Sequence, residues 1–351
     1  MTFDDLDTPC ILVDAKRADS NLTKAQTYAD KQGLKLRPHI KTHKLPLFAK
    51  RQLELGAVGI TCQKLGEAEV MAGAGIPDIL ISYNIVGDAK LARLKKLHDR
   101  LTVTVCADHE AHIQGYADAF TDADHPLPVL VECDTGSQRC GVQSPEDALA
   151  LAQRVAAAPG LRFDGLITYP PRGLVGVNDW FERAKHMLCQ AGLPPRTLSN
   201  GGSPDLYHAH TVTHATEHRP GTYIYLDRMQ VGYGLGTLSD CALTVLATVV
   251  SAPTADRFIL DAGSKALTSD LCDAPGFGHI IEHPDAVIAV LNEEHGIVDA
   301  SRCKSRVTIG DKIRIIPNHV CPVSNLFDSV HLIDGDALVE TIIVAARGQV
   351  T

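Results

Sequence analysis

Arg37-Pro38-His39-Ile40-Lys41-Thr42-His43-Lys44 follows a short apolar run, and from this stretch onward strand and helix patterns alternate along the chain. Eight alternating strands over about 220 residues predict a parallel (β/α)8 barrel. An open doubly wound sheet is the alternative, but no G-x-G-x-x-G follows an early strand. The candidate strands are Leu34–Arg37, Ala57–Thr61, Asp78–Ser82, Leu101–Cys106, Pro128–Cys133, Phe163–Thr168, Arg196–Ser199 and Tyr223–Leu226.

The pattern changes near Ser239, where short strands separated by turns replace the alternation. These strands predict a second, all-β domain. We therefore expect a barrel at residues 12–236 and a β-domain at residues 237–351, joined by residues 1–11. The later candidate strands are Leu243–Ala252, Arg257–Leu260, Ala286–Leu291, Lys312–Ile316, Ser329–Ile333 and Leu338–Ala345.

Composition narrows the class of protein. The chain has 351 residues, 45% of them hydrophobic, and a formal net charge of −9, which argues against nucleic acid or an anionic membrane as partner. No apolar run is long enough to span a membrane. The acidic, polar opening Met1–Asp5 predicts no secretory signal. With ten scattered cysteines and no C-x-x-C pair, these features predict a cytoplasmic protein with reduced thiols.

Reactive side chains fall where barrel strands end, and in this fold function lies at those ends. Lys41 follows the first strand, and a lysine in this position can form a Schiff base with a carbonyl compound. Arg139 follows the fifth strand and Tyr169 the sixth. Ser199-Asn200-Gly201-Gly202-Ser203 follows the seventh and has the form of a phosphate cradle. A solvated basic loop at Lys41 and a plain tight turn at the glycines are the alternatives.

A possible metal pair lies late in the chain. His319 and Cys321 are two residues apart in Pro317-Asn318-His319-Val320-Cys321-Pro322, and on a strand both would face the same side. Imidazole and thiolate are zinc-type ligands, and a two-ligand site would leave positions open for water and substrate. The alternative is a buried thiol beside a hydrogen-bonded histidine.

Taken in order, these motifs resemble the D-threonine aldolase and D-serine dehydratase family. The motifs are R-P-H-x-K-T-H-K, D-T-G-x-x-R-x-G, a glycine pair, R-P-G-T-Y and P-N-H-x-C-P. Members of this family are pyridoxal phosphate enzymes of the alanine racemase fold type. The resemblance implies that Lys41 binds the cofactor covalently and that His319 and Cys321 bind a divalent metal, zinc or manganese. It implies cofactor contacts for Arg139, Tyr169, Ser199, Gly201, Gly202 and Tyr223.

The resemblance also implies a reaction. We expect a metal-dependent lyase of D-β-hydroxy-α-amino acids that cleaves a D-threonine-like substrate to glycine and an aldehyde. A zinc-dependent dehydratase of D-serine or D-3-hydroxyaspartate is the alternative, and an amino acid racemase has less support. The familiar aldolases carry a histidine shortly after the tyrosine, where this chain reads Leu174-Val175-Gly176, so the general base stays open. A small D-amino acid substrate and a homodimer are further expectations.

Overall fold

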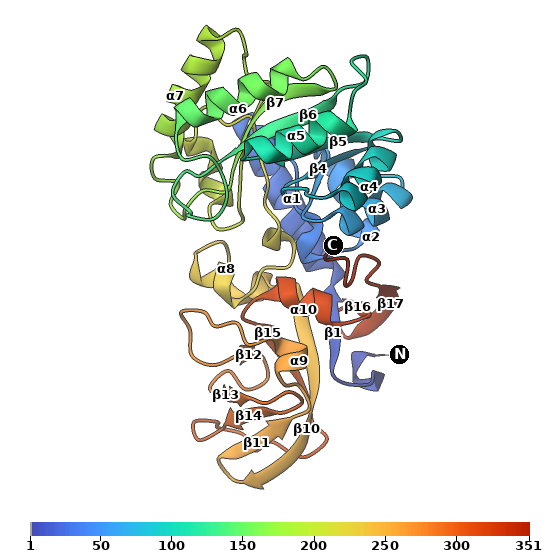
Figure 1. Cartoon of the computed structure of the whole chain (residues 1–351). Coiled ribbons are helices and arrows are strands. Elements are labelled where there is room, and N and C mark those ends of the chain that lie inside the picture. The colour runs from blue at the N-terminus through green and yellow to red at the C-terminus, as the bar shows by residue number, and fades with distance from the viewer. Residues whose placement is uncertain (1) are drawn as a thin grey trace. The chain divides into compact units, whose positions relative to one another are not determined.

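Eight parallel strands form one curled sheet in the computed structural model, which describes residues 2–351 (Figure 1). The strand order is β2-β9-β8-β7-β6-β5-β4-β3. A parallel bridge between His39 and Thr61 joins the two ends of this order, so the edges of the sheet meet. The strands are β2 (Lys35–Leu36), β3 (Ile60–Cys62), β4 (Asp78–Ile81), β5 (Thr102–Ala107), β6 (Leu127–Cys133), β7 (Leu161–Thr168), β8 (Thr197–Asn200) and β9 (Glu217–His218). The predicted α/β barrel architecture is confirmed.

Helices between the strands cover the outside of this sheet (Figure 1). Their boundaries follow local chemistry, as α6 illustrates: the Ser144 hydroxyl accepts a hydrogen bond from the amide of Asp147 over 3.1 Å, and Pro145 opens the helix. The helices are α1 (Ala15–Gln32), α2 (Pro46–Leu55), α3 (Leu65–Gly73), α4 (Asp88–His98), α5 (Glu110–Ala119), α6 (Pro145–Ala157) and α7 (Val177–Gln190).

The eighth predicted strand was wrong. Tyr223–Leu226 is apolar and buried, but its first part forms a 3-10 turn (Thr222–Ile224). The eighth strand of the sheet is Glu217–His218, which pairs with both β8 and β2. A two-residue strand of polar side chains gives no hydrophobic signal. As a consequence, Arg219 lies directly after a strand end, not before a strand.

A second sheet of nine strands is mostly antiparallel. Its main order is β13-β14-β11-β10-β1-β16-β17, and β15 pairs with β10 and β12. The pair β1–β16 is parallel, so the N-terminal strand β1 is part of this sheet. The strands are β1 (Cys10–Asp14), β10 (Leu243–Thr254), β11 (Arg257–Leu260), β12 (Gly278–Ile280), β13 (Val287–Leu291), β14 (Gly296–Asp299), β15 (Lys312–Pro317), β16 (Ser329–Asp334) and β17 (Ala337–Ile343).

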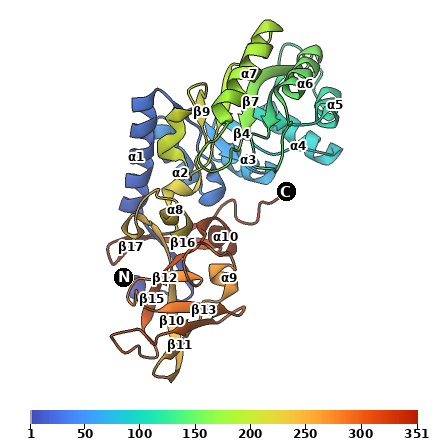
Figure 2. The same cartoon turned by 90° about the vertical axis from the view of Figure 1, so that its left-hand side faces the viewer.

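Three short helices accompany the second sheet: α8 (Arg228–Gly232), α9 (Ser264–Leu267) and α10 (Val320–Leu326). Helices α9 and α10 contact each other and lie together in Figure 2. His319 is the residue before α10, and Cys321 lies in its first turn. The pair therefore does not lie on a strand, because β15 ends at Pro317 and a helix follows.

Contacts divide the chain into two units, which we call the barrel unit and the β-unit. The barrel unit comprises Ala25–Lys41, Pro46–Gly221 and Gln349–Thr351, and the β-unit comprises residues 2–24, Thr42–Leu45 and Thr222–Gly348. The sequence places the boundary at 236, whereas contacts group Thr222 onward with the β-unit. Two hydrogen bonds explain this grouping: Asp227 accepts from the amide of Val320, and Arg228 donates to Asn318. No helix among residues 2–351 is long and apolar enough to cross a membrane.

Candidate active site

Lys41 lies in a short 3-10 turn (Ile40–Thr42) that follows β2. Its backbone amide donates a hydrogen bond to His39 Nδ1 over 3.3 Å, and His39 Nε2 lies 2.9 Å from Gln63 Oε1. The half-buried Lys41 side chain has no hydrogen-bond or ion-pair partner among residues 2–351. The turn is thus held by its backbone, while the amine is available to a carbonyl compound.

Several predicted cofactor residues contact one another in the barrel unit. The guanidinium carbon of Arg139 lies 4.6 Å from the ring centroid of Tyr169, a cation–π contact. A Cβ on Gly202 would lie 3.2 Å from the Tyr169 ring, and one on Gly201 would lie 2.9 Å from the backbone nitrogen of Arg219. Both glycines therefore let the loop after β8 approach its neighbours more closely than a side chain allows.

Ser199 belongs to a buried ionic network at the ends of β8 and β9. Its hydroxyl donates a hydrogen bond to Glu217 Oε1 over 2.5 Å and accepts one from Arg219 Nη1 over 2.6 Å. Arg37 Nε donates to Glu217 Oε2 over 2.9 Å and also pairs with Asp78. We call these five residues the barrel network. The Ser199 hydroxyl is fully used within it, which makes Ser199 a residue that positions Arg219.

Arg219 is the most confined cation of this network. Burial lowers its pKa to about 10, although Glu217 and Glu132 act in the opposite direction, so the guanidinium stays charged at neutral pH. Its second terminal nitrogen donates to the carbonyl of Thr168 over 2.6 Å. Through its bonds to Thr168 and Ser199, the buried guanidinium is suited to holding the ends of β7 and β8 in one geometry.

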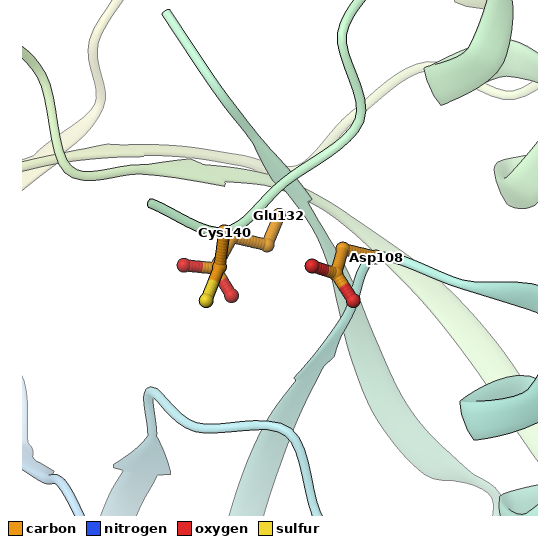
Figure 3. A group of neighbouring side chains, drawn as sticks. All are labelled: Asp108, Glu132 and Cys140. Carbon is orange, nitrogen blue, oxygen red and sulfur yellow. The ribbon is translucent and has the colours of Figure 1, made fainter. Parts of the chain in front are cut away.

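Two carboxylates and a thiol gather near Arg139 at the ends of β5 and β6 (Figure 3). The ligand atoms of Asp108, Glu132 and Cys140 lie within 4.8 Å of one another, a spacing that a metal ion could bridge. Asp108, however, already accepts hydrogen bonds from Asn84 and from the amide of Gly141, each over 2.9 Å. Burial raises the pKa of Glu132, and the nearby Arg139 opposes that shift. We assign this cluster to holding the 134–141 loop.

The barrel unit offers what pyridoxal phosphate requires. The unpartnered Lys41 amine suits the cofactor aldehyde, and the bare backbone of Gly201 and Gly202 suits an anion. Both amide atoms of Asn200 and the Nδ1 of His218 are buried without a hydrogen-bond partner. Unsatisfied buried polar atoms cost about 1–3 kcal/mol each, and such groups concentrate where a ligand completes the site. The residues present therefore fit the cofactor.

His319 and Cys321 are each held by specific side chains of the β-unit. His319 Nδ1 lies 2.7 Å from Asp270 Oδ2, so Nδ1–H donates to the carboxylate. Cys321 Sγ lies 3.1 Å from the hydroxyl oxygen of Thr42 and 3.5 Å from that of Thr222. Thr42 is the residue directly after Lys41 in the sequence.

The backbone of this segment is fixed as firmly as its side chains. Asn318 is fully buried, and its Nδ2 donates to the carbonyls of Asp270 and Gly276, each over 2.9 Å. The Asp227 carboxylate accepts from the amide of Val320 over 3.0 Å. The two candidate ligands therefore follow an anchored turn, as a preorganised metal site requires.

The charges around His319 also suit a cation. Burial alone would lower its pKa, but hydrogen bonds and charge from Cys321 and Asp270, with Asp227, raise it to about 9. With Nδ1 engaged by Asp270, Nε2 is the nitrogen that would give up its proton to bind a metal. A nitrogen and a thiol sulfur in anionic surroundings fit a divalent ion of the zinc type.

Comparison with known proteins identifies the family of this chain. The family description "Alanine racemase, N-terminal domain" matches residues 13–229, and "Putative serine dehydratase domain" matches residues 242–333. A D-threonine aldolase of an Arthrobacter species is 37% identical, over 98% of this chain and 93% of that protein. The chain belongs to the D-threonine aldolase and D-serine dehydratase family. Enzymes of the alanine racemase fold use pyridoxal phosphate.

Solved structures of the family match nearly the whole chain. The D-threonine aldolase from Filomicrobium marinum is 32% identical with a TM-score of 0.93, covering 100% of this chain and 98% of that one. The D-threo-3-hydroxyaspartate dehydratase from Delftia sp. HT23 is 29% identical with a TM-score of 0.87, covering 97% and 98%. That dehydratase is also described as a histidine-to-alanine mutant and as a metal-free cysteine-to-alanine mutant, at positions two apart.

Several residues of the site were missed by sequence reasoning. Arg219 stands in the R-P-G-T-Y motif, whose Tyr223 alone was assigned a role; Tyr223 is buried in the β-unit. Glu217 was not identified from the sequence, because its strand of two residues is too short to be recognised. Asp270 and Asp227 lie 49 and 93 residues from the segment that they bind, and no spacing rule connects such positions.

Proposed function

We propose that this protein is a metal- and pyridoxal phosphate-dependent lyase of D-β-hydroxy-α-amino acids that acts as an aldolase. A D-threonine-like substrate would yield glycine and an aldehyde. The observation that carries the proposal is the combination, in one chain, of the unpartnered Lys41 amine after β2 and the anchored His319/Cys321 pair. Similarity to aldolases over almost the full chain supports it.

The proposed cofactor residues divide by task. Lys41 would hold the cofactor aldehyde, and Gly201 and Gly202 would receive the phosphate on their backbone. Arg139 and Tyr169, already in contact, would bind the ring. The chemistry that pyridoxal phosphate supplies is an electron sink for a bond that breaks at Cα. Ser199 and Tyr223 stay proposed cofactor-binding residues, as the family resemblance implies, and Ser199 also holds Arg219.

In aldol cleavage the substrate β-hydroxyl loses its proton, the Cα–Cβ bond breaks, and the β-carbon leaves as an aldehyde. Cα then gains a proton and the product is glycine, so atoms and electrons balance. His319 Nε2 and Cys321 Sγ would bind the divalent ion, which would lower the pKa of the substrate β-hydroxyl. Because the chain has no histidine shortly after Tyr169, the Lys41 amine would take the proton from the β-hydroxyl and return it to Cα, so the proton count balances.

A dehydratase is the second candidate, and Cys321 favours it. Thiolate is a soft ligand that suits zinc, and the mutant names of the Delftia dehydratase include a cysteine two positions after a histidine. In that reaction the β-hydroxyl leaves as water and the final products are ammonia and a 2-oxo acid. The same metal pair would serve both reactions.

Product analysis tests the proposal. The purified protein is incubated with D-threonine, D-serine and D-3-hydroxyaspartate, each with zinc, with manganese, and with a chelator. Glycine plus an aldehyde, lost in chelator, is the expected result. Ammonia plus a 2-oxo acid would identify the dehydratase instead. Racemisation that persists in chelator would overturn both lyase assignments, because racemisation needs no metal.

We also propose that the protein is a homodimer, as the family resemblance implies. Light scattering coupled to size-exclusion chromatography measures the mass of the assembly in solution. A mass near twice 37.7 kDa is expected. A stable species of single-chain mass with full activity would contradict this part of the proposal.

A further inference from the structure

We propose that Asp270 is a positioning residue for the metal pair, which holds His319 with Nε2 presented to a divalent cation. This inference rests on the proposed metal-binding function of His319 and Cys321. It adds a residue for which neither the sequence motifs nor the comparisons give a role. The Asp270 side chain would not itself bind the metal, because it is already engaged with the other nitrogen of the imidazole.

The Asp270–His319 contact has the geometry that orients an imidazole for metal binding. The carboxylate oxygen Oδ2 lies 2.7 Å from Nδ1, a short, charge-assisted hydrogen bond. When the carboxylate holds Nδ1–H, Nε2 is the nitrogen that can release its proton and bind a metal. Metal-binding histidines generally have such a partner on their second nitrogen, and it orients the ring and strengthens the ligand.

The backbone of Asp270 is anchored independently of its carboxylate. Its carbonyl accepts a hydrogen bond from Asn318 Nδ2, and its amide donates to Thr268 Oγ1 over 3.2 Å. Asn318 is the residue directly before His319. The Asn318 side chain thus ties the backbone of the segment after α9 to the segment before α10, and the backbone that carries the Asp270 carboxylate is held in a fixed position.

The Asp270 carboxylate contributes little to stability, because its side chain is 46% exposed and ion pairs at that exposure are weak. Cys321 does not depend on it, because Thr42 and Thr222 contact the sulfur. Loss of the carboxylate should therefore release the His319 ring and leave the fold and the second ligand in place.

Metal binding to the purified protein, without turnover, tests this role. Zinc affinity is measured by competition with a chromogenic chelator, and cobalt binding by the absorbance of the thiolate–cobalt bond. Asp270→Ala should weaken zinc binding by about 10–100-fold. Asp270→Asn should lie between this variant and the wild type, because its amide oxygen can accept the hydrogen bond but carries no charge. Both variants should keep the melting temperature and the visible absorbance of bound cofactor.

Asp273→Asn is the matched control. Asp273 is an exposed carboxylate of the same segment, so its variant removes the same charge at nearly the same place. Zinc affinity within twofold of wild type is expected for it. An equal loss in the Asp273 and Asp270 variants would overturn the proposal in favour of a general charge effect.

Three other results would also overturn it. Unchanged zinc affinity in Asp270→Ala would show that the carboxylate does not position His319. A loss as large as that of His319→Ala would make Asp270 a ligand itself. Absence of metal binding by the wild-type protein would remove the metal pair, whereas a failure of lyase activity with metal binding intact would leave the Asp270 proposal standing.

Discussion

Ser199 and His319 each donate a hydrogen bond to a carboxylate, over 2.5 Å in the barrel unit and 2.7 Å in the β-unit. The surroundings of the two carboxylates differ. Glu217 is 4% exposed, pairs with Arg37 and acts electrostatically on Arg219. Nearly half of the Asp270 side chain is exposed, and it pairs with one imidazole. Burial makes the barrel network a determinant of stability. The exposure of Asp270 means that its carboxylate contributes little to stability, and His319, at 29% side-chain exposure, is only partly buried.

The largest effect is expected at Lys41 of the barrel unit, the residue proposed to bind the cofactor covalently. Lys41→Ala should abolish the visible absorbance of lysine-bound cofactor and lower activity by at least about a thousandfold, because no other group replaces a covalent amine. Absorbance spectra and initial rates measure this. Lys35→Ala, which removes an exposed lysine of β2, is the control and should behave as wild type. A normal cofactor spectrum in Lys41→Ala would reassign the lysine.

The next largest effect should fall on stability. Arg219→Ala leaves Glu217 with one fewer positive partner inside the protein, and removing one member of a buried ionic group costs about 3–5 kcal/mol. Urea unfolding of the protein without cofactor measures the free energy of unfolding. Arg17→Ala, at a half-exposed ion pair with Asp14, should change that free energy by about 1 kcal/mol or less. An equal loss of unfolding free energy in Arg219→Ala and Arg17→Ala would contradict the expected difference between buried and exposed carboxylates.

A substitution in the metal pair should reduce metal binding and leave cofactor binding unchanged. Cys321→Ala should lose at least about 100-fold in zinc affinity, together with metal-dependent activity, yet keep the cofactor absorbance. Metal content by mass spectrometry and chelator competition measure the loss. Cys303→Ala, at a partly exposed thiol of the same unit, is the control. Metal dependence that persists in Cys321→Ala would exclude Cys321 from the site.

The smallest effect concerns pH. Burial lowers the pKa of His218 to about 4, from an ordinary value near 6.5, so the folded protein keeps this ring neutral. The unfolded chain gains a proton first as pH falls, so stability is complete above pH 6.5 and declines toward pH 4. Between pH 7 and pH 5 the wild type should lose about 2 kcal/mol more than His218→Gln. His208→Gln, at an exposed histidine, should match the wild-type pH dependence, and a matching profile in His218→Gln would contradict the assignment.

Sequence reasoning predicted the barrel end better than the metal segment, and the reason is geometric. Parallel strands bring their carboxyl ends to one edge, so Arg139, Tyr169 and Gly202 could be grouped from strand order alone, and they are in contact. Strand recognition depends on apolar runs. It failed at Glu217–His218, where the strand is two polar residues long.

The metal segment was recognised only as a pair of ligand types. Its Pro317–Pro322 sequence gives no sign that a helix begins at Val320. The partners of the pair come from distant positions: Thr42 lies 279 residues from Cys321, and Asp270 lies 49 from His319. Hydrogen bonds at such separations depend on the complete fold, and local periodicity contains no information about them.

The barrel network restricts how this family member can change in evolution. Arg37, Asp78, Glu217 and Arg219 are two positive and two negative charges. Arg37 pairs with both carboxylates, and the Ser199 hydroxyl links Glu217 to Arg219. A single replacement leaves an unbalanced charge that the interior does not tolerate, while a paired replacement can restore neutrality. Libraries randomised at these four positions should therefore return neutral combinations, and routes from one combination to another should pass through two simultaneous substitutions.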